Sequence, residues 1–176
     1  MTAILFHAID PRDRLFSNNI LLNAGRITSM LTIRSATPCG EGLLSPYEAF
    51  SIEREKEDVF ETIRAREFQN APPRKGALFL FSTPQDATAA NAKWWHGQRV
   101  ILPANILNAS RVGAFDSTQL DAPRDQWESA ARAYWSGAMT THPQIEILLD
   151  GTVQLQGWEP YGKLLGPDAF GIPSPS

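Results

Sequence analysis

The order of short apolar runs and helical patterns restricts the fold of this chain more than any single motif does. A strand is predicted in "TAILFHAI", residues 2–9, because a turn signal follows at Asp10-Pro11. The wholly apolar "ALFLFS", residues 77–82, is typical of a buried strand, and "RVILPA", residues 99–104, indicates another. Helical patterns separate these strands without a regular strand-helix-strand repeat, so we expect an α+β fold.

Three helices are predicted from periodicity and end signals. Across residues 46–68, apolar side chains recur at helical spacing while charged ones face water. Thr83 can cap a helix that begins at Pro84. The third helix lies in "APRDQWESAARAYWSG", residues 122–137, which has proline near its start and glycine past its end.

Two further segments are predicted as strands. Residues 11–45 are ambiguous, and short strands are expected there around residues 20–22 and 30–33. The segment "HPQIEILLDGTVQLQGW", residues 142–158, is predicted to be a β-hairpin, because Asp150-Gly151 is the strongest hairpin signal in the chain.

Length and composition limit the class of protein. The chain has 176 residues, which predicts one domain over residues 1–160 and a tail rich in Gly, Pro and Ser over residues 161–176. The net charge of -3 argues against a strongly basic nucleic-acid binder. With a single cysteine and scattered histidines, no metal site is expected. Neither a signal peptide nor a membrane span is recognisable, so we expect a cytoplasmic protein or a toxin delivered into another cell.

Glu146 is the first candidate for chemistry, because it lies within a predicted strand between Ile145 and Ile147. Strand alternation places it on one face with Gln144. An exposed edge residue and a functional carboxylate are both compatible with this position. His7, at the end of the first strand, is more often structural in such a place, although its imidazole suits a sugar hydroxyl. Neither glycine-rich phosphate motif is present, so a nucleotide would bind by another route.

Three motifs, taken in order, resemble the ADP-ribosyltransferase superfamily, especially its small bacterial members. They are "LFHAI", "GALFLFSTPQDATAANAKW" and "QIEILLDGTVQL". His7 is similar to the histidine of the diphtheria-toxin-like branch, with Ala8 where that branch prefers glycine. Phe79 stands where a stacking tyrosine is usual. The other branch is represented by Gln144-Ile145-Glu146, similar to its Gln-x-Glu motif, and by "FSTP", residues 81–84, similar to its Ser-Thr-Ser.

The resemblance implies a split, twisted β core with flanking helices and NAD bound in a cleft. Glu146 would stabilise the positive charge that develops on the ribose, and Gln144 would meet the acceptor. The residues implied for NAD binding are His7, Ala8, Phe79, Phe81, Ser82 and Thr83. The implied activity is transfer of ADP-ribose to a protein or nucleic acid by a toxin, effector or phage-conflict protein, with an antitoxin or immunity protein as a possible partner. Two alternatives stay open: a non-catalytic binding module with a degenerate cleft, and an NAD glycohydrolase.

Overall fold

The computed structural model describes residues 4–37 and 54–165, and it confirms a mixed α+β architecture around an antiparallel sheet of five strands. The strands are β1 (Leu5–Ile9), β2 (Arg26–Thr28), β3 (Leu78–Leu80), β4 (Val100–Asp116) and β5 (Ile145–Leu155). The helices are α1 (Arg14–Leu22), α2 (Met30–Ala36), α4 (Arg54–Glu67), α5 (Pro84–Trp95) and α6 (Trp127–Trp135). Short 3₁₀ helices are η2 (Ser117–Asp121), η3 (Arg124–Gln126) and η4 (Glu159–Tyr161). Among the described helices, none is long and apolar enough to cross a membrane.

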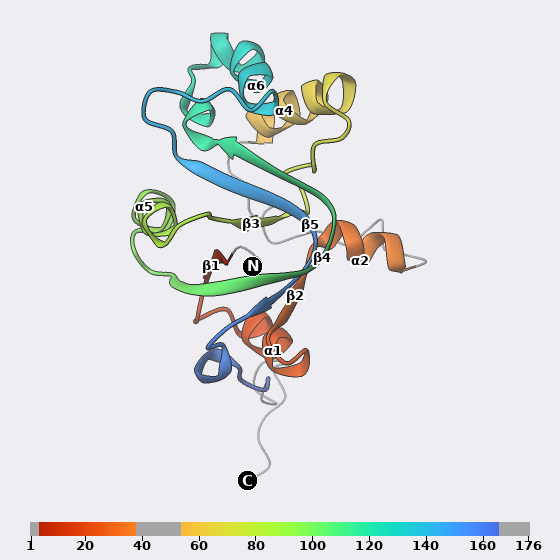
Figure 1. Cartoon of the computed structure of the whole chain (residues 1–176), viewed down its shortest axis with the longest axis vertical. Coiled ribbons are helices and arrows are strands. Elements are labelled where there is room, and N and C mark those ends of the chain that lie inside the picture. The colour runs from red at the N-terminus through yellow and green to blue at the C-terminus, as the bar shows by residue number, and fades with distance from the viewer. Residues whose placement is uncertain (1–3, 38–53, 166–176) are drawn as a thin grey trace.

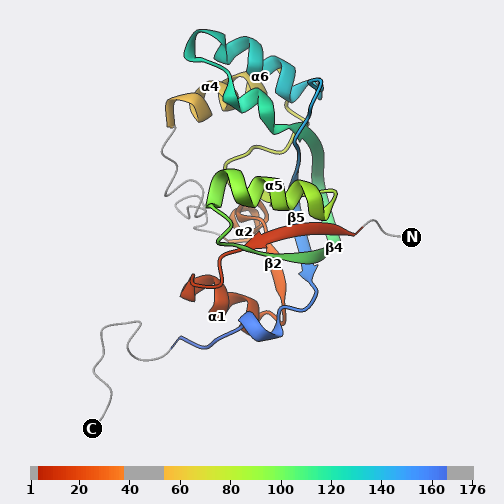
Figure 2. The same cartoon turned by 90° about the vertical axis from the view of Figure 1, so that its left-hand side faces the viewer.

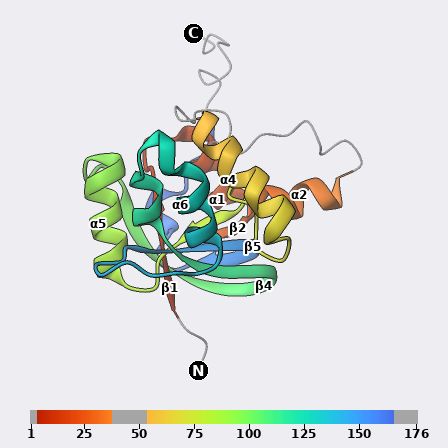
Figure 3. The ribbon, with the colours of Figure 1, turned by 90° about the horizontal axis from the view of Figure 1, so that it is seen from above.

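The strand order is β1-β4-β5-β2, and β3 pairs with β5 beside β2. The helices α4 and α6 lie together at one end of the molecule and α1 lies at the other (Figures 1 and 2). Seen from above, α5 and α2 lie on opposite sides (Figure 3). Three buried clusters follow from this arrangement: one between the sheet and α1, one against α4 and α6, and one under α5.

The predicted hairpin is wrong, because residues 145–155 form one continuous strand, β5. Asp150 and Gly151 lie in its middle, where β4 approaches with irregular register. A Cβ atom on Gly151 would lie 2.2 Å from the carbonyl oxygen of Asn108 and 2.8 Å from Cα of Ala109. Glycine is therefore required here for close backbone approach and not for a turn.

The short strands expected in the ambiguous segment are also wrong. Residues 20–22 belong to α1 and residues 30–33 to α2. Each helix is started by a side-chain cap: Asp13 accepts a hydrogen bond from the Phe16 amide, and Ser29 accepts one from the Thr32 amide. These caps, together with burial of Ile20 on the inner face of α1, outweigh the local preference of β-branched residues for strands.

The remaining predicted elements are confirmed with small shifts. The strand predicted at residues 2–9 is β1, and "ALFLFS" contains β3. "RVILPA" is only the beginning of the 17-residue β4. Thr83 caps α5 with Pro84 in its first turn, and α6 follows η3. The helix predicted at residues 46–68 is present as α4; residues 46–53 and most of the predicted tail lie outside the described residues.

Candidate functional site

Strand β1 is bridged to the residue that follows β3, and the two segments then diverge. Phe6 and Phe81 exchange both backbone hydrogen bonds, at 2.9 and 2.8 Å, as an isolated antiparallel bridge. A continued ladder would next pair Ala8 with Phe79. Instead, the Phe79 carbonyl accepts a hydrogen bond from Nδ1 of His7 at 2.8 Å. The His7 side chain therefore replaces a ladder bond where the two strands separate.

The chemistry of His7 follows from this contact. A carbonyl oxygen only accepts, so Nδ1 carries the proton and Nε2 is left as an acceptor. Burial lowers the pKa of His7 to about 4; the bond to Phe79 opposes this shift and the charge of Arg99 adds to it. Because the ring is neutral near physiological pH, its Nε2 can accept a hydrogen bond from a sugar hydroxyl. Ala8, beside it, is buried, and its carbonyl accepts from Nη1 of Arg99 at 3.3 Å.

Glu146 lies in the interior and is only 1% exposed. Its Oε1 atom accepts hydrogen bonds from Nη1 of Arg74 and from the hydroxyl of Tyr134. The Nε atom of Arg74 also donates to the carboxylate of Glu57, at 3.2 and 3.4 Å. Arg74 follows the proline-rich turn after α4, and its partners from α4, α6 and β5 hold it in the interior.

Two buried polar atoms of this region have no hydrogen-bond partner. Within the described residues, the buried side-chain atoms left unpaired are Oε2 of Glu146 and Nε2 of Gln144. They belong to the two outer residues of the Gln-x-Glu motif, which share a face of the chain. An unpaired polar atom in the interior costs about 1–3 kcal/mol, so such atoms call for a partner.

Three of the predicted site residues, His7, Phe79 and Glu146, are connected in the structure through Arg74, which was not predicted to belong to the site. The guanidinium carbon of Arg74 lies 5.2 Å from the ring centre of Phe79 and 5.3 Å from that of Tyr134. His7 therefore contacts Phe79, Phe79 contacts Arg74, and Arg74 pairs with Glu146. Burial raises the pKa of the Tyr134 hydroxyl well above its ordinary value, so this group stays protonated and donates to Glu146.

Ser82, Thr83 and Phe81 lie apart from this chain of contacts. The hydroxyls of Ser82 and Thr83 donate to the carboxylate of Asp86, at 3.1 and 2.7 Å, in the exposed first turn of α5. In the described part of the chain, no hydrogen bond joins Ser82 to His7 or Glu146. The ring of Phe81 is fully buried in the cluster under α5. Ser82 and Thr83 therefore have the contacts of residues at the start of a helix, and Phe81 has those of a core residue.

Asp116 is a residue that sequence reasoning missed. It is fully buried, and its carboxylate accepts hydrogen bonds from Thr118, from Thr140 and from the backbone amide of Gln144, the last at 3.0 Å. Burial pushes the pKa of Asp116 upward, but the bonds from Thr140 and Thr118 outweigh it and lower the pKa to about 2. Asp116 thereby fixes the entry of β5, where Gln144 lies. Aspartate before Ser-Thr was the available signal.

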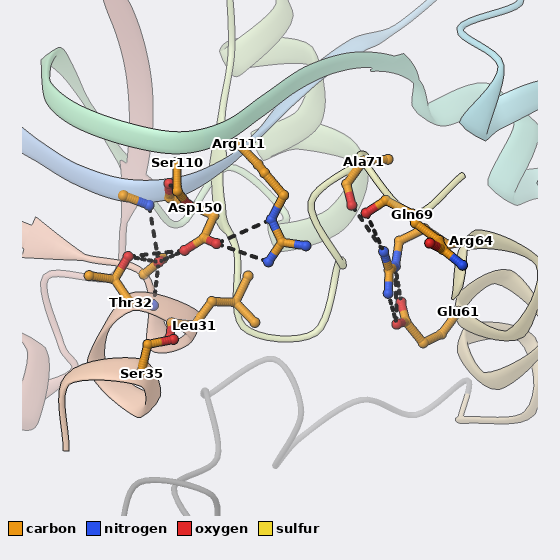
Figure 4. A network of polar contacts seen from close by, with 12 residues as sticks. Leu31, Thr32, Ser35, Glu61, Arg64, Gln69, Ala71, Ser110, Arg111 and Asp150 are labelled. Carbon is orange, nitrogen blue, oxygen red and sulfur yellow. Dashed lines mark hydrogen bonds and ion pairs between the residues drawn. The ribbon is translucent and has the colours of Figure 1, made fainter. Parts of the chain in front are cut away.

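A second polar network lies beside β5 and joins it to α2 (Figure 4). Oδ1 of Asp150 accepts from the hydroxyls of Ser29 and Thr32, at 2.9 and 3.0 Å, and Oδ2 accepts from Arg111 at 3.0 Å. Burial raises the pKa of Asp150, but hydrogen bonds from Arg111 and from the hydroxyls outweigh it, so the net shift is downward. The same view shows Arg64, which ties the turn before Arg74 to α4 by bonding Glu61 and the carbonyl of Ala71. The polar groups around Asp150 and those around Arg64 pair with one another, so both networks have the contacts of interactions that stabilise the fold.

No metal centre emerges from the residues described: they contain no group of three or more His, Cys, Asp or Glu side chains placed to hold an ion.

A family model described as a protein of unknown function (DUF2441) matches residues 41–158, more than half of the chain. The matched segment includes Arg74, Phe79, Tyr134 and Glu146, while β1 with His7 lies outside it. No curated protein matches the sequence.

Proposed function

We propose that this chain, which belongs to the DUF2441 family of proteins of unknown function, is an NAD-dependent ADP-ribosyltransferase. The observation that carries the proposal is the pair of unpaired buried atoms, Nε2 of Gln144 and Oε2 of Glu146. A ligand that supplies a donor to the carboxylate and an acceptor to the amide would satisfy both atoms. A ribose hydroxyl offers both functions.

The divergence of β1 from β3 supports the finer fold assignment, a split and twisted β core of the ADP-ribosyltransferase type. His7 stands at this divergence with Nε2 as a free acceptor, and the ring of Phe79 lies in contact with Arg74. An NAD molecule held by His7 at one ribose and flanked by Phe79 would reach toward Glu146 along the contacts described above.

The proposed reaction breaks the glycosidic bond between nicotinamide and ribose and forms a bond from the same ribose carbon to the acceptor. Glu146 keeps Oε1 fixed by Arg74 and Tyr134, and its Oε2 faces the ribose hydroxyl. Its charge stabilises the positive charge that develops on the sugar as neutral nicotinamide leaves. Gln144, placed by Asp116, orients the acceptor, which is a protein or nucleic-acid group that gives up its proton.

A second candidate, a non-catalytic binding module, is favoured by the burial of Glu146. A carboxylate that is 1% exposed and bonded to Arg74 and Tyr134 already has a structural use. An NAD glycohydrolase is a variant of the main proposal in which water replaces the acceptor.

The test compares two variants that remove the same charge from the same arginine. Glu146→Gln and Glu57→Gln each take one carboxylate from Arg74, but only Glu146 has the unpaired oxygen. NAD binding is followed by thermal shift, and turnover by nicotinamide release with and without a cell lysate. We expect Glu146→Gln to retain NAD binding and to lose roughly 10²–10³ in turnover, while Glu57→Gln stays close to the parent.

Three results would separate the candidates. Absence of NAD binding at millimolar concentration in folded protein refutes the enzyme proposal. Binding of NAD without nicotinamide release in the parent protein supports the binding module. Nicotinamide release without transfer of labelled ADP-ribose to a lysate component identifies the glycohydrolase.

A further inference from the structure

A basic cavity lies where the chain leaves β1 and enters α1, outside the site described above. Its volume is about 410 Å³. It is lined by Pro11, Arg12, Arg14, Ser17, Lys163 and Leu164. This volume is at the lower end of the range for small-molecule sites and is ample for a phosphate or pyrophosphate.

Three cations face this cavity, although the whole chain has a net charge of -3. Arg12 is held by both carboxylate oxygens of Asp10, each at 3.0 Å. Arg14 and Lys163 have no ion-pair partner among the described residues. Their charges come from segments far apart in the sequence, which the fold joins through a hydrogen bond from the Lys163 amide to the Ser17 carbonyl at 3.2 Å.

Ser17 supplies a second and independent indication of a ligand. The residue is 2% exposed, and its backbone groups are bonded to Asp13 and Lys163. Its hydroxyl, by contrast, has no hydrogen-bond partner in the described part of the chain, and it belongs to the wall of the cavity. The hydroxyl is not among the fully enclosed unpaired atoms of the described residues, so it keeps access to the cavity, where it can donate to an anion held beside the two cations.

We propose that this cavity binds a phosphate group, with Arg14, Lys163 and Ser17 as its donors. Arg14 provides a planar fork that matches two phosphate oxygens, Lys163 a point charge, and Ser17 a neutral hydrogen bond. The phosphate is either inorganic or part of a nucleotide. The inference does not rest on the proposed enzymatic activity, because it concerns different residues.

The first test measures binding of inorganic pyrophosphate at low salt by calorimetry and thermal shift. The double variant Arg14→Gln/Lys163→Gln is compared with a matched double variant, Arg26→Gln/Arg54→Gln, which removes two exposed cations that do not line the cavity. We expect the parent and the matched control to bind, and the cavity variant to lose about tenfold or more in affinity. Ser17→Ala should weaken binding by a smaller factor and leave its salt dependence unchanged.

The proposal is overturned if the folded parent does not bind millimolar pyrophosphate, or if the matched control loses as much affinity as the cavity variant. Competition then identifies the source of the phosphate. If NAD displaces pyrophosphate while nicotinamide riboside does not, the cavity holds the phosphates of a nucleotide. If NAD binds without displacing pyrophosphate, or does not bind at all, the cavity is a site for inorganic phosphate. The last outcome would leave this inference standing and remove the enzymatic proposal.

Discussion

Arg74 and Glu146 form an ion pair that is almost fully enclosed, with side chains 6% and 1% exposed, and only one oxygen of the carboxylate takes part in it. Glu57 occupies another side of the same guanidinium. The carboxylates of Glu57 and Glu146 and the hydroxyl of Tyr134 therefore all accept hydrogen bonds from the guanidinium of Arg74. The arrangement holds α4, α6 and β5 together and at the same time leaves Oε2 of Glu146 unpaired.

Replacing Arg74 with methionine should lower the free energy of unfolding by roughly 3–5 kcal/mol, because two buried carboxylates lose their counter-charge. Urea unfolding measures the change. Arg66→Met is the control: the Arg66 side chain is 62% exposed beside Glu67, and its loss should change stability by about 0.5 kcal/mol or less. Similar losses in both variants would show that the buried cluster contributes no more than a surface pair.

His7 should make the protein sensitive to acid. Its pKa is about 4 in the folded state and near the ordinary 6.5 when unfolded, so the unfolded state binds the proton more readily. The stability that this group contributes is present above pH 6.5 and is lost as the pH falls toward 4, up to about 3 kcal/mol. Unfolding free energies of the parent and His7→Gln, measured across this range, should converge at the acid end.

The exposed His142 provides the control for that experiment. His142→Gln should follow the pH profile of the parent protein. If His7→Gln follows it as well, the imidazole of His7 is not buried in its neutral form.

Gly151→Ala should be strongly destabilising. Its new Cβ would meet backbone atoms of β4 at 2.2 and 2.8 Å, which cannot move without opening the central strand pair. We expect a loss of about 3 kcal/mol or more in thermal or urea unfolding. Gly113→Ala is the matched strand control, because its closest neighbour, at 2.5 Å, is the end of the Phe115 side chain and not the backbone of a partner strand. Equal losses would contradict the close-approach explanation.

Asp116→Asn should remove about 2 kcal/mol at neutral pH, since one carboxylate oxygen that accepts from Thr140 becomes a donor. The pKa of Asp116 is about 2 in the folded protein and 3.8 ordinarily, so this stabilisation is present above 3.8 and is lost as the pH falls through 2. The gap between parent and variant should therefore shrink in acid. If the difference in unfolding free energy between the parent and Asp116→Asn does not change with pH, the loss of stability comes from packing and not from the charge of Asp116.

The elements that the sequence predicted correctly depend on neighbouring residues. Thr83 and Pro84 start α5 by a cap and a fixed backbone angle, and both signals lie within one turn. The prediction of a hairpin was wrong because the sequence Asp150-Gly151 is compatible both with a turn and with a strand that a neighbouring backbone approaches closely. The choice is made by the β4 backbone at Asn108, some 40 residues earlier.

The candidate site was predicted in part. Glu146 and His7 stand out as polar residues within apolar strands, a pattern that is visible in the sequence alone. Arg74 did not stand out, because it lies in a charged, proline-rich turn and its partner Glu146 is 72 residues away. Its burial depends on how α4, α6 and β5 meet, which no local pattern records.

The central place of β5 has a consequence for biosynthesis. Among the described strands, β2 and β3 each form their ladder with β5, so neither has its ladder partner until residues 145–155 leave the ribosome. Pairs such as Arg26 with Gln154 close very long loops, a topology that folds slowly. β1 and β4 can form their antiparallel ladder before β5 has been synthesised. The apolar segment of β3 therefore lacks its ladder partner until one late strand has been made, and during that time it is exposed to association with other chains.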